Sequence, residues 1–108
     1  MRQHRGERAI VDGYGEPSNT LTIRGVHTWY WGFEVINSDP TRVYVTRVNV
    51  DDPASPDRVR GTGVNILGPH IKCINLIVHD PLNGIALWEA AVDTEICGVL
   101  TYNNGVVD

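Results

Sequence analysis

Six acidic residues and three tryptophans are the side chains of this sequence whose chemistry could serve a reaction or a ligand. Two facing carboxyl groups can act as acid and base in hydrolysis, and carboxylates can also bind Ca²⁺ beside a residue that removes a proton. The acids in question are Glu34, Asp39, Asp80, Glu89, Asp93 and Glu95, and the tryptophans are Trp29, Trp31 and Trp88. Whether any of them act together depends on the elements that position them.

Short apolar runs occur along most of the chain, and the elements they form must position these side chains. The runs are rich in β-branched residues and are bounded by Gly, Asn, Asp or Pro, which predicts strands. They cover residues 9–11, 21–23, 33–36, 43–45, 64–66, 74–78 and 96–100. The best helical candidate, residues 87–92, is short and lacks a convincing cap, so we expect a strand end followed by a turn.

The chain repeats itself with a fixed register. Residues 21–37 align with residues 64–80 at an offset of 43 without a gap. A further copy starts at Gly84, where Ile85 matches Val64 at an offset of 21, and residues 95–103 match residues 72–80 at an offset of 23. A period in the low twenties is typical of one coil of a β-solenoid. We therefore predict an all-β fold, a right-handed parallel β-helix of about three to four coils, as one domain over residues 1–108.

Residues 41–60 interrupt this repeat. Residues 42–50 alternate like a strand, and residues 51–57 have the composition of a loop. The segment is either an extra coil or a projecting hairpin. We favour a projecting insertion, because its apolar pattern does not match the repeat.

In a β-helix the residues at equivalent positions of successive coils stack in columns. The register predicts three interior columns and one polar column at a turn. The interior columns are Tyr30 with Cys73 and Ile96, Phe33 with Leu76 and Val99, and Val35 with Val78 and Thr101; the polar column is Asn37 with Asp80 and Asn103.

The same register decides which reactive groups can meet. No two acids share a column in adjacent coils outside the mixed polar turn, so we do not expect paired catalytic carboxylates. Lys72 lies over Glu95, which predicts an exposed ion pair between neighbouring strands. Cys73 and Cys97 are one position out of register and should face opposite sides of the wall, so we predict no disulfide.

His27 and His70 share a column and could bring two imidazoles within reach of one metal ion if their coils are adjacent. His79 falls elsewhere in the coil. A cupin-like metal site would need a His-x-His pair followed by Glu and a further His, and this pattern is missing from the sequence. We therefore assign no metal, and we expect these histidines to have structural partners.

Several motifs in a definite order carry a resemblance to a known family. They are Thr-Trp-Tyr-Trp-Gly-Phe-Glu-Val at residues 28–35, Arg-Gly-Thr-Gly-Val-Asn-Ile at 60–66, Gly-Pro-His at 68–70 with Lys72, Ala-Val-Asp-Thr-Glu-Ile at 91–96 and Tyr-Asn-Asn-Gly at 102–105. From about residue 3 to residue 105 the chain resembles the right-handed parallel β-helix proteins of the pectate-lyase-like superfamily. It starts inside an incoming coil and stops where similar proteins add coils, as a short fragment or truncated relative would. Cys73 and Cys97 stand where larger aromatic residues are expected.

The resemblance implies a carbohydrate-associated protein, because many members bind or cleave polysaccharides, although fold alone does not establish function. We expect a polysaccharide-binding segment, or the remnant of a lyase or hydrolase, with outward tryptophans that stack on sugar rings. The expected ligand-binding residues are Trp29, Trp31, Lys72, Trp88 and Glu95. No catalytic residue and no cofactor is carried over. In the alternative, the insertion at residues 41–60 folds down and covers Trp29 and Trp31, and the cost of exposing tryptophans without a partner favours this arrangement.

A second reading is a structural module that assembles with copies of itself. Open coil ends expose unpaired backbone groups and apolar columns, which favour a homo-oligomer. The contact is expected at the C-terminal coil, with Leu100, Thr101, Tyr102, Val106 and Val107. A small metal-binding cupin-like β-protein is a weaker third reading.

Composition narrows the partners further. The net charge of −4 and the scattered basic residues argue against a nucleic-acid partner. No apolar stretch is long enough for a membrane span, so we expect no membrane partner. Residues 1–8 lack the apolar core of a signal peptide. The localisation is therefore unassigned, although the resemblance implies secretion.

Overall fold

A computed structural model describes residues 5–14, 19–40 and 61–105 of this chain. These residues form ten three-residue strands and no helix. The strands are β1 (Ile10–Asp12), β2 (Leu21–Ile23), β3 (Trp29–Trp31), β4 (Glu34–Ile36), β5 (Val64–Ile66), β6 (Lys72–Ile74), β7 (Ile77–His79), β8 (Ile85–Leu87), β9 (Glu95–Cys97) and β10 (Leu100–Tyr102).

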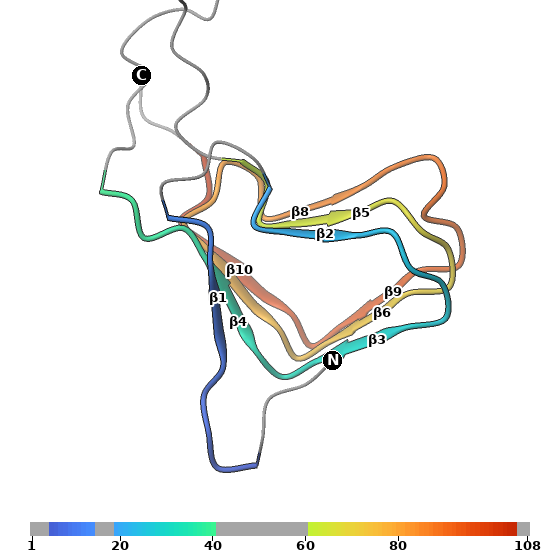
Figure 1. Cartoon of the computed structure of the whole chain (residues 1–108), viewed down its shortest axis with the longest axis horizontal. Helices are drawn as coiled ribbons and strands as arrows, with labels where there is room; N and C mark the ends of the chain where they lie inside the picture. The colour runs from blue at the N-terminus through green and yellow to red at the C-terminus, as the bar shows by residue number, and fades with distance from the viewer. Residues whose placement is uncertain (1–4, 15–18, 41–60, 106–108) are drawn as a thin grey trace, which may run out of the picture.

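The strands pair into three parallel sheets that form the walls of a solenoid. The strand orders are β1-β4-β7-β10, β2-β5-β8 and β3-β6-β9. Figure 1 looks down the axis of the solenoid, so the three walls form the sides of a triangle and successive coils lie one behind another. The predicted all-β fold, a parallel β-helix of about three coils, is confirmed. The predicted insertion at residues 41–60 lies outside the described residues.

The strand register reproduces the offsets of the sequence repeat. Leu21 pairs with Val64 and Trp29 with Lys72, both at an offset of 43. Val64 pairs with Ile85, and Lys72 with Glu95, at the shorter offsets of 21 and 23. The register holds because a one-residue slip would turn every interior side chain outward.

Interior columns form the core, and the central coil is buried best. Fully or almost fully buried are Ile23, Phe33, Val35, Val64, Ile66, Ile71, Cys73, Leu76 and Val78. The three predicted interior columns follow the observed register. Ile96 and Thr101 are nevertheless exposed, because β9 and β10 are edge strands with no coil stacked on their outer side among the described residues.

Residues with positive φ mark the corners between walls. One corner has His27, His70 and Asp93, with φ of 54°, 56° and 52°; the next has Gly32, Asn75 and Gly98; the third has Asp80 and Asn103. Gly, Asn, Asp and His tolerate this left-handed conformation better than other residues. At Gly98 a second constraint applies, because Oδ1 of Asn75 occupies the space that a Cβ would need. Asp80 and Asn103 of the predicted polar column therefore have a backbone cause. Asn37, the third member, lacks a positive φ and instead accepts a hydrogen bond from the backbone amide of Asp39 at 3.1 Å.

The expected strand end and turn at residues 87–92 is confirmed. Leu87 ends β8, and the amide of Ala91 then donates to the carbonyl oxygen of Trp88 at 2.8 Å, which closes a turn. The chain continues from there to the corner at Asp93. This turn places Trp88 at the end of the β2-β5-β8 wall.

Candidate functional site

The outer face of the β3-β6-β9 sheet holds four of the five predicted ligand-binding residues. Strand β3 turns the half-buried Tyr30 inward, and Trp29 and Trp31 on either side of it are 52% and 40% exposed. Trp29 pairs with Lys72, and Lys72 pairs with Glu95. These four residues, Trp29, Trp31, Lys72 and Glu95, are called the tryptophan wall below.

Side-chain contacts connect three members of the tryptophan wall. The Nζ atom of Lys72 lies 4.9 Å from the centre of the Trp29 ring and 3.0 Å from Oε2 of Glu95. The predicted ion pair between neighbouring strands is thus present, and a cation–π contact continues it to the indole. Such an exposed pair adds about 0–1 kcal/mol to stability. Its chemical effect is to place a hydrogen-bond donor and an acceptor beside an aromatic face.

Trp88 lies on a different wall. Its Nε1 donates to Oδ1 of Asn65 at 2.5 Å. Asn65 is in the middle of β5 between Val64 and Ile66 of the core, so its side chain points out of the β2-β5-β8 sheet. Asn65 is only 7% exposed. The structure therefore brings Trp29, Trp31, Lys72 and Glu95 together and places Trp88 on another face.

The alternative in which residues 41–60 cover Trp29 and Trp31 falls on residues outside those described. It stays a prediction.

A second polar cluster occupies the outer face of the β1-β4-β7-β10 sheet. Nε2 of His79 lies 2.5 Å from Oε1 of Glu34, and its Nδ1 lies 2.6 Å from Oδ2 of Asp80. Nε of Arg8 donates to the other oxygen of Glu34 at 2.7 Å. The side-chain Nδ2 of Asn103 donates to the other oxygen of Asp80. We call Arg8, Glu34, His79, Asp80 and Asn103 the His79 cluster.

The His79 cluster brings two acids close together without freeing either of them. All four carboxylate oxygens of Glu34 and Asp80 contact a nitrogen of the protein. Glu34 is also buried. The hydrogen bond to His79, the largest effect, lowers the pKa of Glu34, and Arg8 lowers it further against the opposing effect of burial. An ionised carboxylate with both oxygens occupied is poorly placed to exchange a proton with a ligand.

Sequence reasoning missed this cluster because it compared only residues at directly equivalent positions. The register places His79 opposite Ile36, which is two residues from Glu34 on the same face of β4. The side chains meet diagonally across two coils. Extending the comparison to neighbours two residues away would have found the contact.

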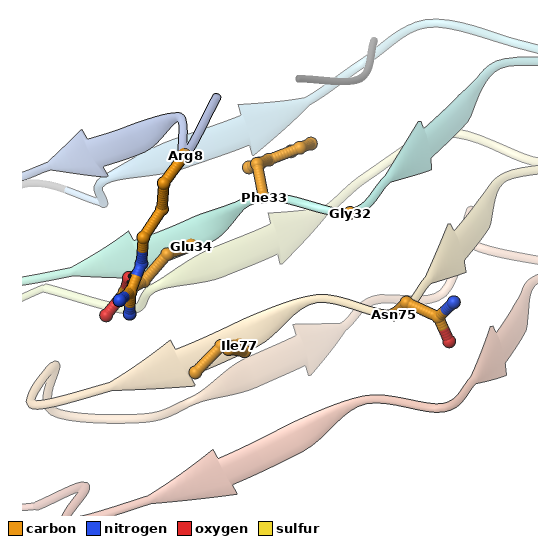
Figure 2. Close-up of a pocket in the computed structure, with 6 residues that line it drawn as sticks. All are labelled: Arg8, Gly32, Phe33, Glu34, Asn75 and Ile77. Carbon is orange, nitrogen blue, oxygen red and sulfur yellow. Dashed lines mark hydrogen bonds and ion pairs between the residues drawn. The ribbon is translucent and has the colours of Figure 1, made fainter. Parts of the chain in front are cut away.

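A cavity of about 270 Å³ lies beside the His79 cluster at the corner between β3 and β4. It is lined by Arg8, Gly32, Phe33, Glu34, Asn75 and Ile77. Figure 2 shows the Arg8 side chain extending to Glu34. Ile77 lies on the neighbouring strand of the same wall. None of the predicted ligand-binding residues lines this cavity, although Trp31 directly precedes Gly32 in the sequence.

His27 and His70 are neighbours in one column, as the register predicted, and their rings stack. Their ring centroids are 4.5 Å apart and their planes differ by 4°. The lone pairs of an imidazole lie in its ring plane, so two stacked rings direct them along parallel lines and not at one ion between them. Nδ1 of His70 lies 3.6 Å from Oδ2 of Asp93. The described part of the chain has no group of three or more His, Cys, Asp or Glu side chains arranged to hold a metal ion.

The two cysteines are free thiols, and they face opposite sides of one wall as predicted. Cys73 is buried in the core, whereas Cys97 is exposed on β9. Burial raises the pKa of the Cys73 thiol to about 11. A disulfide between them would require the register of the wall to change.

No helix in the described residues has the length and apolar character needed to cross a membrane. Comparisons with protein-family models, with curated proteins and with solved structures found no match to this chain.

Proposed function

We propose that this chain binds a polysaccharide on the tryptophan wall. The observation that carries the proposal is a pair of outward indoles, Trp29 and Trp31, held on one face of a single strand and each about half exposed. Indole faces stack well on the apolar faces of sugar rings. A rigid strand also limits the conformational entropy that is lost when a ligand binds.

Lys72 and Glu95 supply the polar part of the proposed site. Lys72 can donate hydrogen bonds to hydroxyl oxygens, and Glu95 can accept hydrogen bonds from hydroxyl groups. Both residues lie in the same column as Trp29. Because their ion pair is exposed, exchanging part of it for contacts with hydroxyl groups carries a small energetic cost. The indole faces and the two side chains that can bond to hydroxyl groups, Lys72 and Glu95, together favour a neutral or weakly charged glycan.

The experiment is affinity electrophoresis of the protein in gels that contain different polysaccharides, followed by titration calorimetry with the best ligand. We expect Trp29→Ala and Trp31→Ala each to weaken binding by about tenfold or more, as for central aromatic contacts in other interfaces. Trp88→Ala is the matched control, because it removes an exposed indole from another wall, and it should bind as the unchanged protein does. Binding that survives the double substitution of Trp29 and Trp31 would refute the proposal.

Self-association through the β8-β9-β10 edge is a second candidate function. Each of these strands is at the edge of its sheet. Ile96, Leu100 and Tyr102 are 43%, 56% and 46% exposed there. A second copy that continues the coils would pair the edge backbone groups and cover these apolar side chains. Val106 and Val107, which were also expected in this contact, lie outside the described residues.

Sedimentation velocity over a wide concentration range tests the second candidate without any glycan. We expect a concentration-dependent increase in mass that Ile96→Lys weakens, with circular dichroism to check that the variant stays folded. A folded chain that remains monomeric at the highest concentration would rule this candidate out.

A further inference from the structure

We propose that His79 is a pH-sensitive clasp, which fastens β10 and its turn to the neighbouring coils while the ring is protonated and loosens them when the proton leaves. The proposal concerns the β1-β4-β7-β10 wall, and it does not depend on the proposed glycan or on self-association.

The first argument is a count of protons. Nε2 and Nδ1 of His79 both face carboxylate oxygens, at 2.5 Å and 2.6 Å. An ionised carboxylate only accepts hydrogen bonds, and a neutral imidazole has a single N–H to donate. Both contacts are satisfied together only when the ring carries both protons.

The second argument concerns the charges around the ring. Glu34 faces His79 from β4, Asp80 from the turn after β7, and Tyr102 from β10; Arg8 reaches the cluster through Glu34. Arg8 balances one carboxylate, and protonated His79 balances the other. Asp12 of β1 is in the same column but bonds to Ser38, with Oδ2 2.5 Å from the hydroxyl oxygen.

These contacts determine how the ring titrates. Burial, the largest single effect, would lower the pKa of His79. The hydrogen bonds and charges of Glu34 and Asp80 together outweigh it, so the net result is a raised pKa. A group with a raised pKa in the folded state stabilises the fold fully below its unfolded pKa, near 6.5, and loses that contribution as the pH rises through the folded value.

The third argument connects the ring to β10. The Tyr102 ring stacks on His79 with centroids 4.6 Å apart and planes within 9° of parallel. The next residue, Asn103, donates to Asp80. Among the described strands β10 pairs only with β7. Side-chain contacts to the His79 cluster therefore add to the backbone pairing with β7 that holds β10. A charged ring stacks more strongly on tyrosine than a neutral one.

The experiment measures the protonation of His79 and the opening of β10 on the same sample. Long-range ¹H–¹⁵N spectra of the imidazoles should show both His79 nitrogens protonated at pH 6, and a titration should place its pKa above 6.5. In Glu34→Gln the pKa of His79 should fall, because a negative charge is removed while the shape is kept. His70→Gln should leave the titration of His79 unchanged, since His70 lies at a different corner.

Hydrogen exchange gives the second readout. The protection factors of the β10 amides, corrected for the intrinsic rate, should fall about tenfold between pH 6 and pH 9, as expected when one charge-assisted hydrogen bond is lost. Those of β6 in the central coil should not change. His79→Gln should remove the pH dependence in β10.

Three results would each overturn the clasp. The first is a titration in which the pKa of His79 is not raised above 6.5. The second is β10 protection that does not change with pH in the unchanged protein. The third is His70→Gln removing the pH dependence as completely as His79→Gln does. Should His79→Gln fail to fold, the titration of His79 in Glu34→Gln still decides the question.

Discussion

Leu76→Ala should be among the most damaging apolar substitutions in this chain. Leu76 is fully buried in the central coil and lies in one interior column with Phe33 and Val99. Truncation to alanine removes contacts to the coils on both sides. The control is Leu100→Ala, which makes the same chemical change in the edge strand at a side chain that is 56% exposed.

The expected cost follows from how little the site can relax. Backbone hydrogen bonds fix the coil spacing around the column, from the Ile77 amide to the Phe33 carbonyl at 3.1 Å and from the Leu100 amide to the Leu76 carbonyl at 2.9 Å. A cavity held open in this way belongs in the upper part of the range for Leu→Ala in cores, about 3–5 kcal/mol. Leu100→Ala should cost less than about 1 kcal/mol, because most of its surface already meets water.

Urea unfolding followed by far-ultraviolet circular dichroism measures both variants. With a slope of about 1–3 kcal/mol per molar urea, Leu76→Ala should lower the midpoint by more than about 1 M. A domain of this size has a total stability of about 5–15 kcal/mol, so the substitution should remove about a fifth of it or more. Equal costs for the two substitutions would refute the reasoning, because they would show that the interior columns are not tightly packed.

Three further predictions test other parts of the fold. A thiol reagent at pH 8 should modify Cys97 in the folded protein and Cys73 only on unfolding, because Cys73 is buried with a pKa near 11; equal native rates would contradict the register. Gly63→Ala should lower stability by about 1–3 kcal/mol in thermal unfolding, because a Cβ there lies 2.8 Å from a core valine methyl and from a carbonyl oxygen, whereas Gly25→Ala, with nothing nearer than 3.4 Å, should change little. Burial, the largest effect, would raise the pKa of Asp12, but hydrogen bonds from neighbouring residues lower it overall, so ionised Asp12 stabilises the fold above about pH 3.8 and this stabilisation is lost as the pH falls. Asp12→Asn should therefore reduce the loss of folding stability between neutral and acidic pH in urea unfolding, and an unchanged loss would argue against this role.

The register of the solenoid could be predicted from the sequence because it depends on local chemistry repeated at a constant spacing. Leu21 over Val64 and Trp29 over Lys72 follow from alternating apolar residues at an offset of 43, and any slip would reverse inside and outside. Asp80 and Asn103 at a corner follow from their tolerance of positive φ. The exposure of Trp29 and Trp31 follows from the same alternation around Tyr30.

Other features depended on the angles between walls and on diagonal contacts between side chains of different columns. The alignment of residues within one column does not reveal either of them. Trp88 was grouped with Trp29 by residue type, but the turn after β8 leaves it on another wall, bonded to Asn65. Glu34 and His79 meet only diagonally, and their hydrogen bond required the actual side-chain directions. The sequence by itself therefore determined the coil, its register and its inward and outward faces. Tertiary structure alone decided which outward side chains share a wall and which polar groups bond to each other, because those depend on how the chain bends at its corners.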